Sequence, residues 1–144
     1  MSKLKILKVP NPILRQSCPR HEGSYQQILN DLLDTMKDIG YGLAAPQVGV
    51  LTRLAVVRTS SSKEPIVLVN PEIINRLGRS SAQEACLSLP GISLDILRWE
   101  TIFVRSDAWM GSRRFHGITA RAIQHECDHL EGICIDERIA RELS

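Results

Sequence analysis

The segment that most constrains the fold lies near the end of the chain, where two histidines and a glutamate share one predicted helix. His125-Glu-Cys-Asp-His129 falls inside a helix that we expect from about Thr119 to Leu130, ended by Gly132. At about 100° per residue, His125 and His129 project from one face, one turn apart, where two imidazoles can grip one metal ion. Glu126 projects beside the pair, from where a carboxylate can act as general base on a bound water.

The remaining residues of this helix indicate how it is buried. Ile123, Cys127 and Leu130 form an apolar stripe next to the histidines. The side that we expect to face water carries Arg121, Gln124, Asp128 and Glu131. Burying two histidines and a glutamate without partners is costly, so the pattern favours a metal site over a solvated helix with coincidental charges.

A metal site with two histidines needs at least one further ligand. The extended zinc-peptidase pattern H-E-x-x-H-x-x-G-x-x-H fails here, because Ile135 stands at its last position. The acidic residues that follow the helix lie in a tail that we expect to be too short to fold back, namely Asp136, Glu137 and Glu142.

The third ligand is therefore expected upstream, where the candidates are His21, His116 and Cys86. A Cys86 thiolate gives a site of one cysteine and two histidines with a fourth position for water. The alternative is that Cys86 is a small buried packing residue, the role that we expect for Cys127 and Cys134.

Length and composition predict one domain, residues 1–144, without disulfides. The 144 residues have 43% hydrophobic and 24% charged side chains, close to the globular average.

A net charge of +2 is far from the basic field that nucleic-acid binding needs. No run approaches the ~20 apolar residues of a membrane span, and Met1-Ser-Lys-Leu-Lys does not resemble a signal peptide. We therefore expect a soluble, cytoplasmic protein whose four cysteines stay reduced.

The order of the predicted elements indicates an α+β fold. Prolines keep the opening segment extended. A first helix is expected from Tyr25 to Ile39, capped by Ser24 and Gln27 and stopped by Gly40. The predicted strands are Arg53–Arg58, Ile66–Asn70, Leu94–Leu97 and Thr101–Arg105, with a turn near Gly111-Ser112.

One further segment combines small residues with a single amide side chain. Gly40-Tyr-Gly-Leu-Ala-Ala-Pro-Gln-Val-Gly49 lets a backbone or a ligand approach closely, although it could also be only a helix end and a turn. A phosphate loop is a poor alternative, because no Lys-Ser/Thr pair follows the glycines. The Gln47 amide is suited to stabilise a developing oxyanion.

Three blocks in this order resemble the peptide deformylase family. The family patterns G-φ-G-φ-A-A-x-Q, E-G-C-φ-S and H-E-x-x-D-H are similar to 40–47, 84–88 and 124–129 of this chain. The resemblance also covers the opening arm and Asn70-Pro-Glu-Ile73, and it identifies a compact form with a short C-terminal tail. It implies antiparallel or mixed sheets packed around a central metal-binding helix.

The resemblance implies a hydrolase that removes the formyl group from N-formylmethionyl peptides of nascent proteins and releases formate. Cys86, His125 and His129 would bind the metal, which is usually Fe²⁺ in this family, although Zn²⁺, Ni²⁺ or Co²⁺ can occupy the site. Glu126 would accept the proton of the attacking water, and the Gln47 side chain and the Leu87 backbone N–H would hold the oxyanion.

The same resemblance suggests how the peptide is held. The expected substrate-binding residues are Tyr41, Gly42, Ala85, Leu87 and Ala122, with the peptide added as a strand near Gly42 and Ala85. Glu84 and Arg98 match family positions that form an ion pair supporting the cysteine loop, a pair that contributes little at a surface. Ala85 replaces the family's glycine, and we expect a negative φ there.

Two other classes of function remain at this point. A zinc-dependent peptidase could use the same helix and would cleave unformylated peptides, and a metal-stabilised binding protein would need no catalytic glutamate. For the deformylase we expect a monomer with formyl-methionyl peptides as partners, a transient association with the ribosome, and neither nucleic-acid specificity nor membrane attachment.

Overall fold

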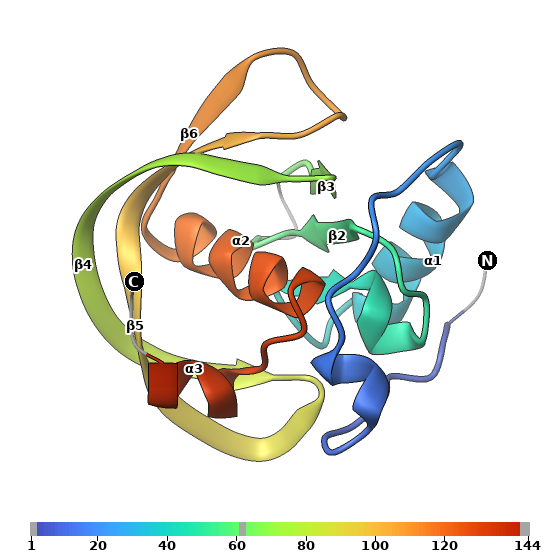
Figure 1. Cartoon of the computed structure of the whole chain (residues 1–144), viewed down its shortest axis with the longest axis horizontal. Helices are drawn as coiled ribbons and strands as arrows, with labels where there is room; N and C mark the ends of the chain where they lie inside the picture. Colours follow the sequence, from blue (N-terminus) through green and yellow to red (C-terminus); the bar gives the residue numbers. More distant parts are fainter. Residues whose placement is uncertain (1–2, 61–62, 142–144) are drawn as a thin grey trace.

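A computed structural model describes residues 3–60 and 63–141 and places two antiparallel three-stranded sheets around one helix, α2 (Gly117–Leu130). The helix runs through the middle of the molecule, between the two sheets (Figure 1). This arrangement confirms the predicted α+β fold with a central helix, and both sheets are wholly antiparallel.

The first sheet has the order β1 (Gly42–Ala44), β2 (Leu54–Val57), β3 (Ile66–Val69). All four residues of β2 are buried, because Val56 packs on the α1 (Gln26–Met36) side while Ala55 and Val57 pack on the α2 side. A strand covered on both faces needs an unbroken apolar sequence, which is why these strands were predictable. β1 forms one edge of this sheet.

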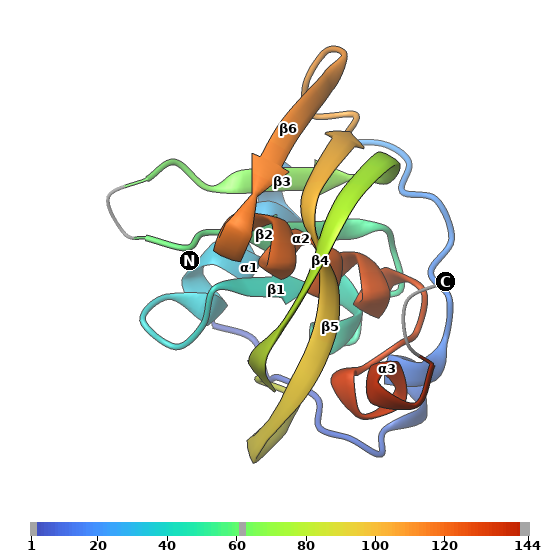
Figure 2. The ribbon, with the colours of Figure 1, turned by 90° about the vertical axis from the view of Figure 1, so that its left-hand side faces the viewer.

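The second sheet consists of β4 (Glu72–Cys86), β5 (Leu89–Arg105) and β6 (Ser112–His116). β4 and β5 form a long hairpin that arches around α2, and Figure 2 shows the two strands crossing in front of the helix. The segments predicted as separate strands, 94–97 and 101–105, are parts of the single strand β5. The predicted turn at Gly111 joins β5 to β6.

The boundaries of the first helix differ from the prediction. α1 begins at Gln26 with Tyr25 as its N-cap and without a side-chain cap, so the expected capping pair of Ser24 and Gln27 is wrong. The Gln27 amide instead donates to Asp31, one turn further on. The helix ends at Met36, because Lys37 leaves the helical conformation and Asp38 takes a φ of 65°, before Gly40 is reached.

The polar side of α2 does not face water as expected. Gln124 is 5% exposed, and its amide bonds both backbone groups of Trp99, accepting from N–H at 3.0 Å and donating to C=O at 2.8 Å. It thereby continues the ladder of β5 just beyond the Thr101–His116 pair that ends β6. Asp128 accepts hydrogen bonds from Arg98 and Arg138, and only Glu131 is exposed.

The chain outside the sheets wraps the C-terminal end of α2. The opening arm is extended apart from a 3₁₀ turn, η1 (Pro12–Arg15), and a second 3₁₀ turn, η2 (Ala45–Val48), follows β1. Gly132 has a φ of 80°, and a Cβ there would lie 2.6 Å from the carbonyl carbon of Arg15. Gly132 therefore ends the helix and also lets the arm pass close to it.

The last element is α3 (Ile135–Arg141), which carries two of the tail's acidic residues away from the histidines. Asp136 and Glu137 bond the guanidinium of Arg15, while Glu142 lies outside the described residues.

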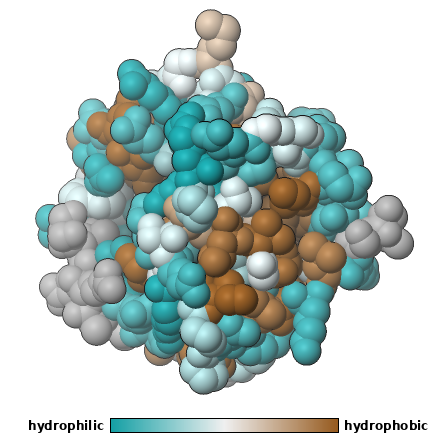
Figure 3. Space-filling view, turned by 45° about the vertical axis from the view of Figure 1, so that its right-hand side comes forward, coloured by the Kyte–Doolittle hydropathy of each residue, from teal (hydrophilic) through white to brown (hydrophobic). Residues whose placement is uncertain are grey.

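In the part of the chain described, no helix has the length and apolar character needed to cross a membrane. The side of the molecule that carries α1 and the arm bears one apolar patch ringed by polar side chains (Figure 3).

Candidate metal centre and cleft

Three potential metal ligands converge where the end of β4 meets α2. Cys86, His125 and His129 each offer one donor atom, and these three atoms lie within 4.8 Å of one another. The Cys86 Sγ is 3.4 Å from the His129 Nε2. The structure thus brings together the three residues predicted as ligands, and it leaves out the other two histidines, which bond elsewhere.

The two excluded histidines have separate roles in the fold. The half-buried His21 ring bonds the Thr52 hydroxyl at 2.8 Å, and the His116 ring bonds the Thr101 hydroxyl at 2.8 Å. Cys127 packs against the core, as expected. Cys134 also packs in an apolar cluster, but its Sγ additionally lies 3.9 Å from the His129 Nδ1. All four cysteines are free of disulfide bonds, as we expected from the setting.

A buried carboxylate orients one of the imidazoles. Glu84 Oε1 lies 2.9 Å from the His125 Nδ1, which directs the other ring nitrogen toward the cluster. The guanidinium of Arg98 donates to both oxygens of Glu84, at 2.9 Å each. The predicted pair of Glu84 and Arg98 therefore exists, but with Arg98 only 2% exposed it is buried rather than superficial.

The backbone of the cysteine segment accepts alanine without strain. Among the described residues other than glycine, only Asp38 and Asn70 have a positive φ. Ala85 lies in the extended strand β4, opposite Ser93, so the expected negative φ is confirmed. The replacement of glycine at this position leaves the Cys86 side chain in place beside the histidines.

The two rings differ in protonation: His129 is ready to bind a cation, whereas His125 must lose a proton to do so. Burial lowers the pKa of His129 well below its usual value, so this ring is neutral and has a free lone pair. Burial also acts to lower the pKa of His125, but hydrogen bonds to Cys86 and Glu84 outweigh it and raise this pKa to about 10. One thiolate and two imidazoles are donors that Zn²⁺ and the neighbouring divalent transition metals prefer, so the buried trio fits such an ion.

Glu126 lies beside the trio with one oxygen unpaired. Its side chain is 4% exposed, and within 3–60 and 63–141 its Oε1 has no hydrogen-bond partner. Burial raises the pKa of Glu126 to about 7, although the charges of His125 and Arg98 oppose this shift. A buried carboxylate with such a pKa can both accept and return a proton near neutral pH.

A glycine makes room for this carboxylate. A Cβ on Gly42 would lie 2.5 Å from the Glu126 Oε2, closer than real Cβ contacts occur. Gly42 begins β1, so the edge strand passes directly over the glutamate. The absence of a side chain at Gly42 therefore allows the backbone of segment 40–49 to approach Glu126 closely, as the sequence suggested.

Gln47 is held rigidly next to Cys86. It is 1% exposed, and its Oε1 accepts from the Ala44 N–H at 3.0 Å. Its Nε2 donates to the Ser88 hydroxyl at 3.1 Å and points to the Cys86 Sγ at 3.8 Å. The long contact to sulfur leaves this second amide hydrogen able to serve another acceptor in the cleft.

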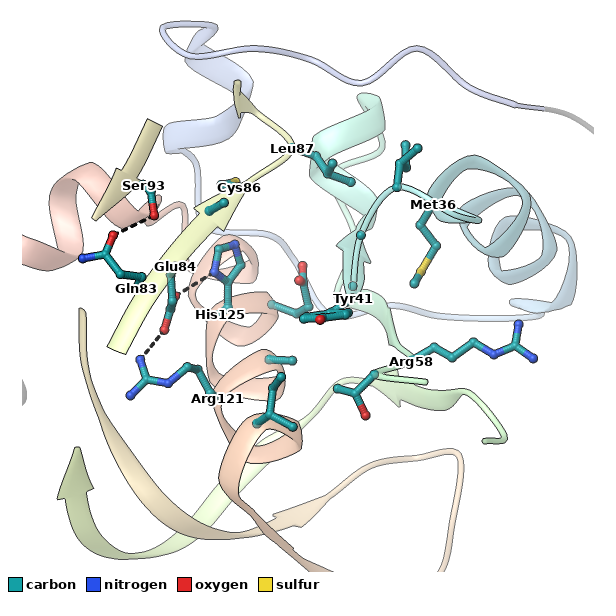
Figure 4. A pocket seen from close by; sticks show the side chains of 18 of the residues that line it. Met36, Tyr41, Arg58, Gln83, Glu84, Cys86, Leu87, Ser93, Arg121 and His125 are labelled. Carbon is teal, nitrogen blue, oxygen red and sulfur yellow. Dashed lines mark hydrogen bonds and ion pairs between the residues drawn. The ribbon is translucent and has the colours of Figure 1, made fainter. Parts of the chain in front are cut away.

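These groups open onto one cleft of about 1480 Å³. All five predicted substrate-binding residues line it, namely Tyr41, Gly42, Ala85, Leu87 and Ala122. Sequence reasoning did not identify Ile118, Trp99 or Arg121 as further wall residues. The spacing of Arg121, one turn before His125, was a signal for its place on the same face, and Figure 4 shows both side chains reaching Glu84.

Comparison with known proteins identifies relatives over the whole length of the chain. The model of the polypeptide deformylase family matches residues 3–143. A peptide deformylase of Dehalococcoides mccartyi is 38% identical over 99% of this chain and 89% of its own length. The crystal structure of a peptide deformylase from Legionella pneumophila is 37% identical and covers 99% of this chain and 87% of its own, with a TM-score of 0.89.

A third relative was solved with a peptide. The structure of a class I type b peptide deformylase from Acinetobacter baumannii bound to Met-Ala-Ser is 30% identical to this chain. It covers 95% of this chain and 98% of its own, with a TM-score of 0.86. Both the sequence and the arrangement of the elements are thus similar to those of this group of enzymes.

Proposed function

Because the chain belongs to the polypeptide deformylase family, we propose that it hydrolyses the N-formyl group of N-formylmethionyl nascent peptides and releases formate. The observation that carries the proposal is the unpaired, buried Oε1 of Glu126 beside a cysteine and two histidines at the cleft. A zinc-dependent peptidase acting on the same helix is not favoured, because the relatives match this chain from end to end.

The metal would be held by Cys86, His125 and His129. We propose Fe²⁺ as the native ion, with Zn²⁺, Ni²⁺ or Co²⁺ able to occupy the same donors. When bound, a divalent ion supplies Lewis acidity, which lowers the pKa of a coordinated water from 15.7 toward about 7.

The protein's own groups then move the proton and hold the developing charge. Glu126 accepts the proton of the attacking water and gives it to the amine as the C–N bond breaks, leaving formate and a free N-terminal methionine. The Gln47 amide and the Leu87 backbone N–H donate to the carbonyl oxygen as it becomes an oxyanion. The fixed orientation of Gln47 means that little reorganisation is needed at this step.

The cleft offers both a backbone and a side-chain site for the peptide. β1 is an edge strand, and Gly42 and Ala85 both line the cleft, so an extended peptide can add between them as a strand. The methionine side chain would lie against Tyr41, Leu87 and Ala122. The binding of Met-Ala-Ser by the Acinetobacter relative supports a peptide that begins with methionine.

We further propose that residues 1–144 act as one catalytic domain and as a monomer. We also propose a cytoplasmic location and a transient association with the ribosome, because the proposed substrates are nascent chains. We propose neither nucleic-acid specificity nor membrane attachment.

The decisive experiment follows formate release from a formyl-Met peptide by protein loaded with Ni²⁺ in air or Fe²⁺ without oxygen. We expect Glu126→Ala to lower kcat by at least about 100-fold with its metal content unchanged, because the acid–base group is lost. Glu131→Ala, an exposed glutamate at the end of the same helix, is the control and should keep the wild-type rate. Equal rates for wild type and Glu126→Ala, or cleavage of internal peptide bonds instead, would contradict the proposal.

A further inference from the structure

Arg121 is a nearly buried cation in the cleft wall that the proposed reaction does not use. It lies on α2 one turn before His125, and its side chain is 13% exposed. The two terminal nitrogens of its guanidinium donate hydrogen bonds to four acceptor atoms on the β4–β5 hairpin. A solvated residue of the cleft wall does not need a guanidinium held by four hydrogen bonds, so these contacts indicate a further role.

The first contact is with the carboxylate that orients a metal ligand. Nη1 of Arg121 donates to Glu84 Oε2 at 2.6 Å, while His125 bonds the other oxygen, Oε1, at 2.9 Å. Arg98 donates to both oxygens. The carboxylate therefore has four hydrogen bonds to three residues, and Arg121 fixes the oxygen that His125 does not contact. Figure 4 shows Glu84 between Arg121 and His125.

The remaining contacts tie the helix to both strands of the hairpin. Nη1 also donates to the Ile96 C=O at 2.8 Å, and Nη2 donates to the Ser80 C=O at 2.7 Å and to its hydroxyl at 3.3 Å. Ser80 belongs to β4, the strand that ends at Cys86, and Ile96 belongs to β5. One guanidinium thus joins α2, which carries the two histidines, to the strand that carries the thiol.

We infer that Arg121 is a positioning residue of the metal centre, which acts through Glu84 on the His125 ring and through Ser80 and Ile96 on the distance between Cys86 and α2. The inference rests on the proposed function only for the identity of the metal ligands. Lysine can supply a charge to Glu84 but has no planar fork with which to reach both strands. The effect should therefore depend on the shape of the guanidinium as well as on its charge.

The test compares Arg121→Met and Arg121→Lys with wild type, using Ni²⁺ affinity measured by competition with a chelator and the visible spectrum of the Co²⁺-loaded protein. Outer groups that orient metal ligands are worth roughly 10–100-fold in affinity, so Arg121→Met should weaken Ni²⁺ binding by about tenfold or more and shift the Co²⁺ bands. Arg121→Lys should restore part of the affinity. Arg20→Met, which removes an exposed pair with Asp107, is the control and should match wild type.

An Arg121→Met variant that loses thermal stability but keeps the wild-type Ni²⁺ affinity and Co²⁺ spectrum would overturn the inference, because the contacts would then serve the fold alone. If Arg121→Met does not fold, a folded Arg121→Lys with wild-type affinity and spectrum overturns it equally. These readouts need no turnover. A wild-type protein that binds Ni²⁺ but releases no formate would contradict the proposed function and leave this inference standing.

Discussion

At the scale of single residues, Gly42 sets how closely the edge strand can approach Glu126, the proposed acid–base group. A methyl group there would meet the Glu126 carboxylate at 2.5 Å, so either the strand or the carboxylate must move. We predict that Gly42→Ala lowers kcat by about tenfold or more, because a misplaced proton acceptor loses its geometry. Overpacking of this kind costs about 1–3 kcal/mol of folding free energy.

The control for this prediction is Gly40→Ala. The Cβ added at Gly40 would lie 3.1 Å from Leu87 Cδ1, the end of a side chain that can rotate away. Formate release and urea unfolding of the two variants should therefore differ clearly. Similar rates for Gly42→Ala and Gly40→Ala would show that the contact with Glu126 does not matter.

The residues that helical spacing alone revealed are those whose partners are close in the chain, whereas Cys86 and Gln47 were identified from the three blocks taken together. His125, Glu126 and His129 share one helix, so their spacing alone brought them to one face. Gln124 and Asp128 were assigned to water, because a helical wheel cannot show that β5 and Arg98 pass beside them. The buried state of Glu84 was equally invisible, since its partners come from two other elements.

At the scale of elements, α3 is docked by charge onto the opening arm. Asp136 bonds the Arg15 guanidinium at 2.9 Å and 3.2 Å, and this hydrogen bond lowers the pKa of Asp136 below its usual value against the effect of burial. A carboxyl whose pKa is lower in the folded than in the unfolded state stabilises the folded state above about pH 4. This contribution is lost as the pH falls through the pKa of the folded state.

We predict that Asp136→Asn removes part of the acid dependence of stability. The free energy of unfolding should fall less steeply below about pH 4 in the variant than in wild type, and the difference should stay under about 1 kcal/mol because the pair is partly exposed. Urea titrations at several pH values measure it. Arg15→Met should produce the same flattening, and a variant curve parallel to that of wild type would refute the assignment.

The elements that the sequence predicted well are those with a clear apolar pattern. α2, β2 and β3 were placed to within about two residues, because apolar residues recur on one face of the helix and run unbroken along the two strands. The hairpin of β4 and β5 was not foreseen as continuous. Most of β4 is exposed, so its residues carry little of the alternation that marks a half-buried strand.

At the scale of the whole molecule, the donor set spans two elements that otherwise meet through packing and hydrogen bonds. We predict that Ni²⁺ raises the midpoint of thermal unfolding, by roughly 5–10 °C at a hundred times its dissociation constant, because it binds the folded state alone. Scanning calorimetry with Ni²⁺ and with a chelator measures the difference. Cys86→Ala should abolish this difference, since one of the three donors is gone.

Cys127→Ala is the matched comparison, because it removes a thiol that packs against the core. Cys127 lies on α2, the helix of the two histidines, but does not belong to the trio. This variant should be less stable than wild type but should keep its full response to Ni²⁺. A response that survives in Cys86→Ala would place the ion elsewhere.

The arch of β4 and β5 around α2 also imposes an order of events during synthesis. During synthesis Cys86 leaves the ribosome before His125 and His129, and the hairpin has no helix to pack against until α2 has emerged. A nascent chain that stops before α2 therefore holds only one of the three donors, and the proposed ion site is complete only when α2 has packed against the arch.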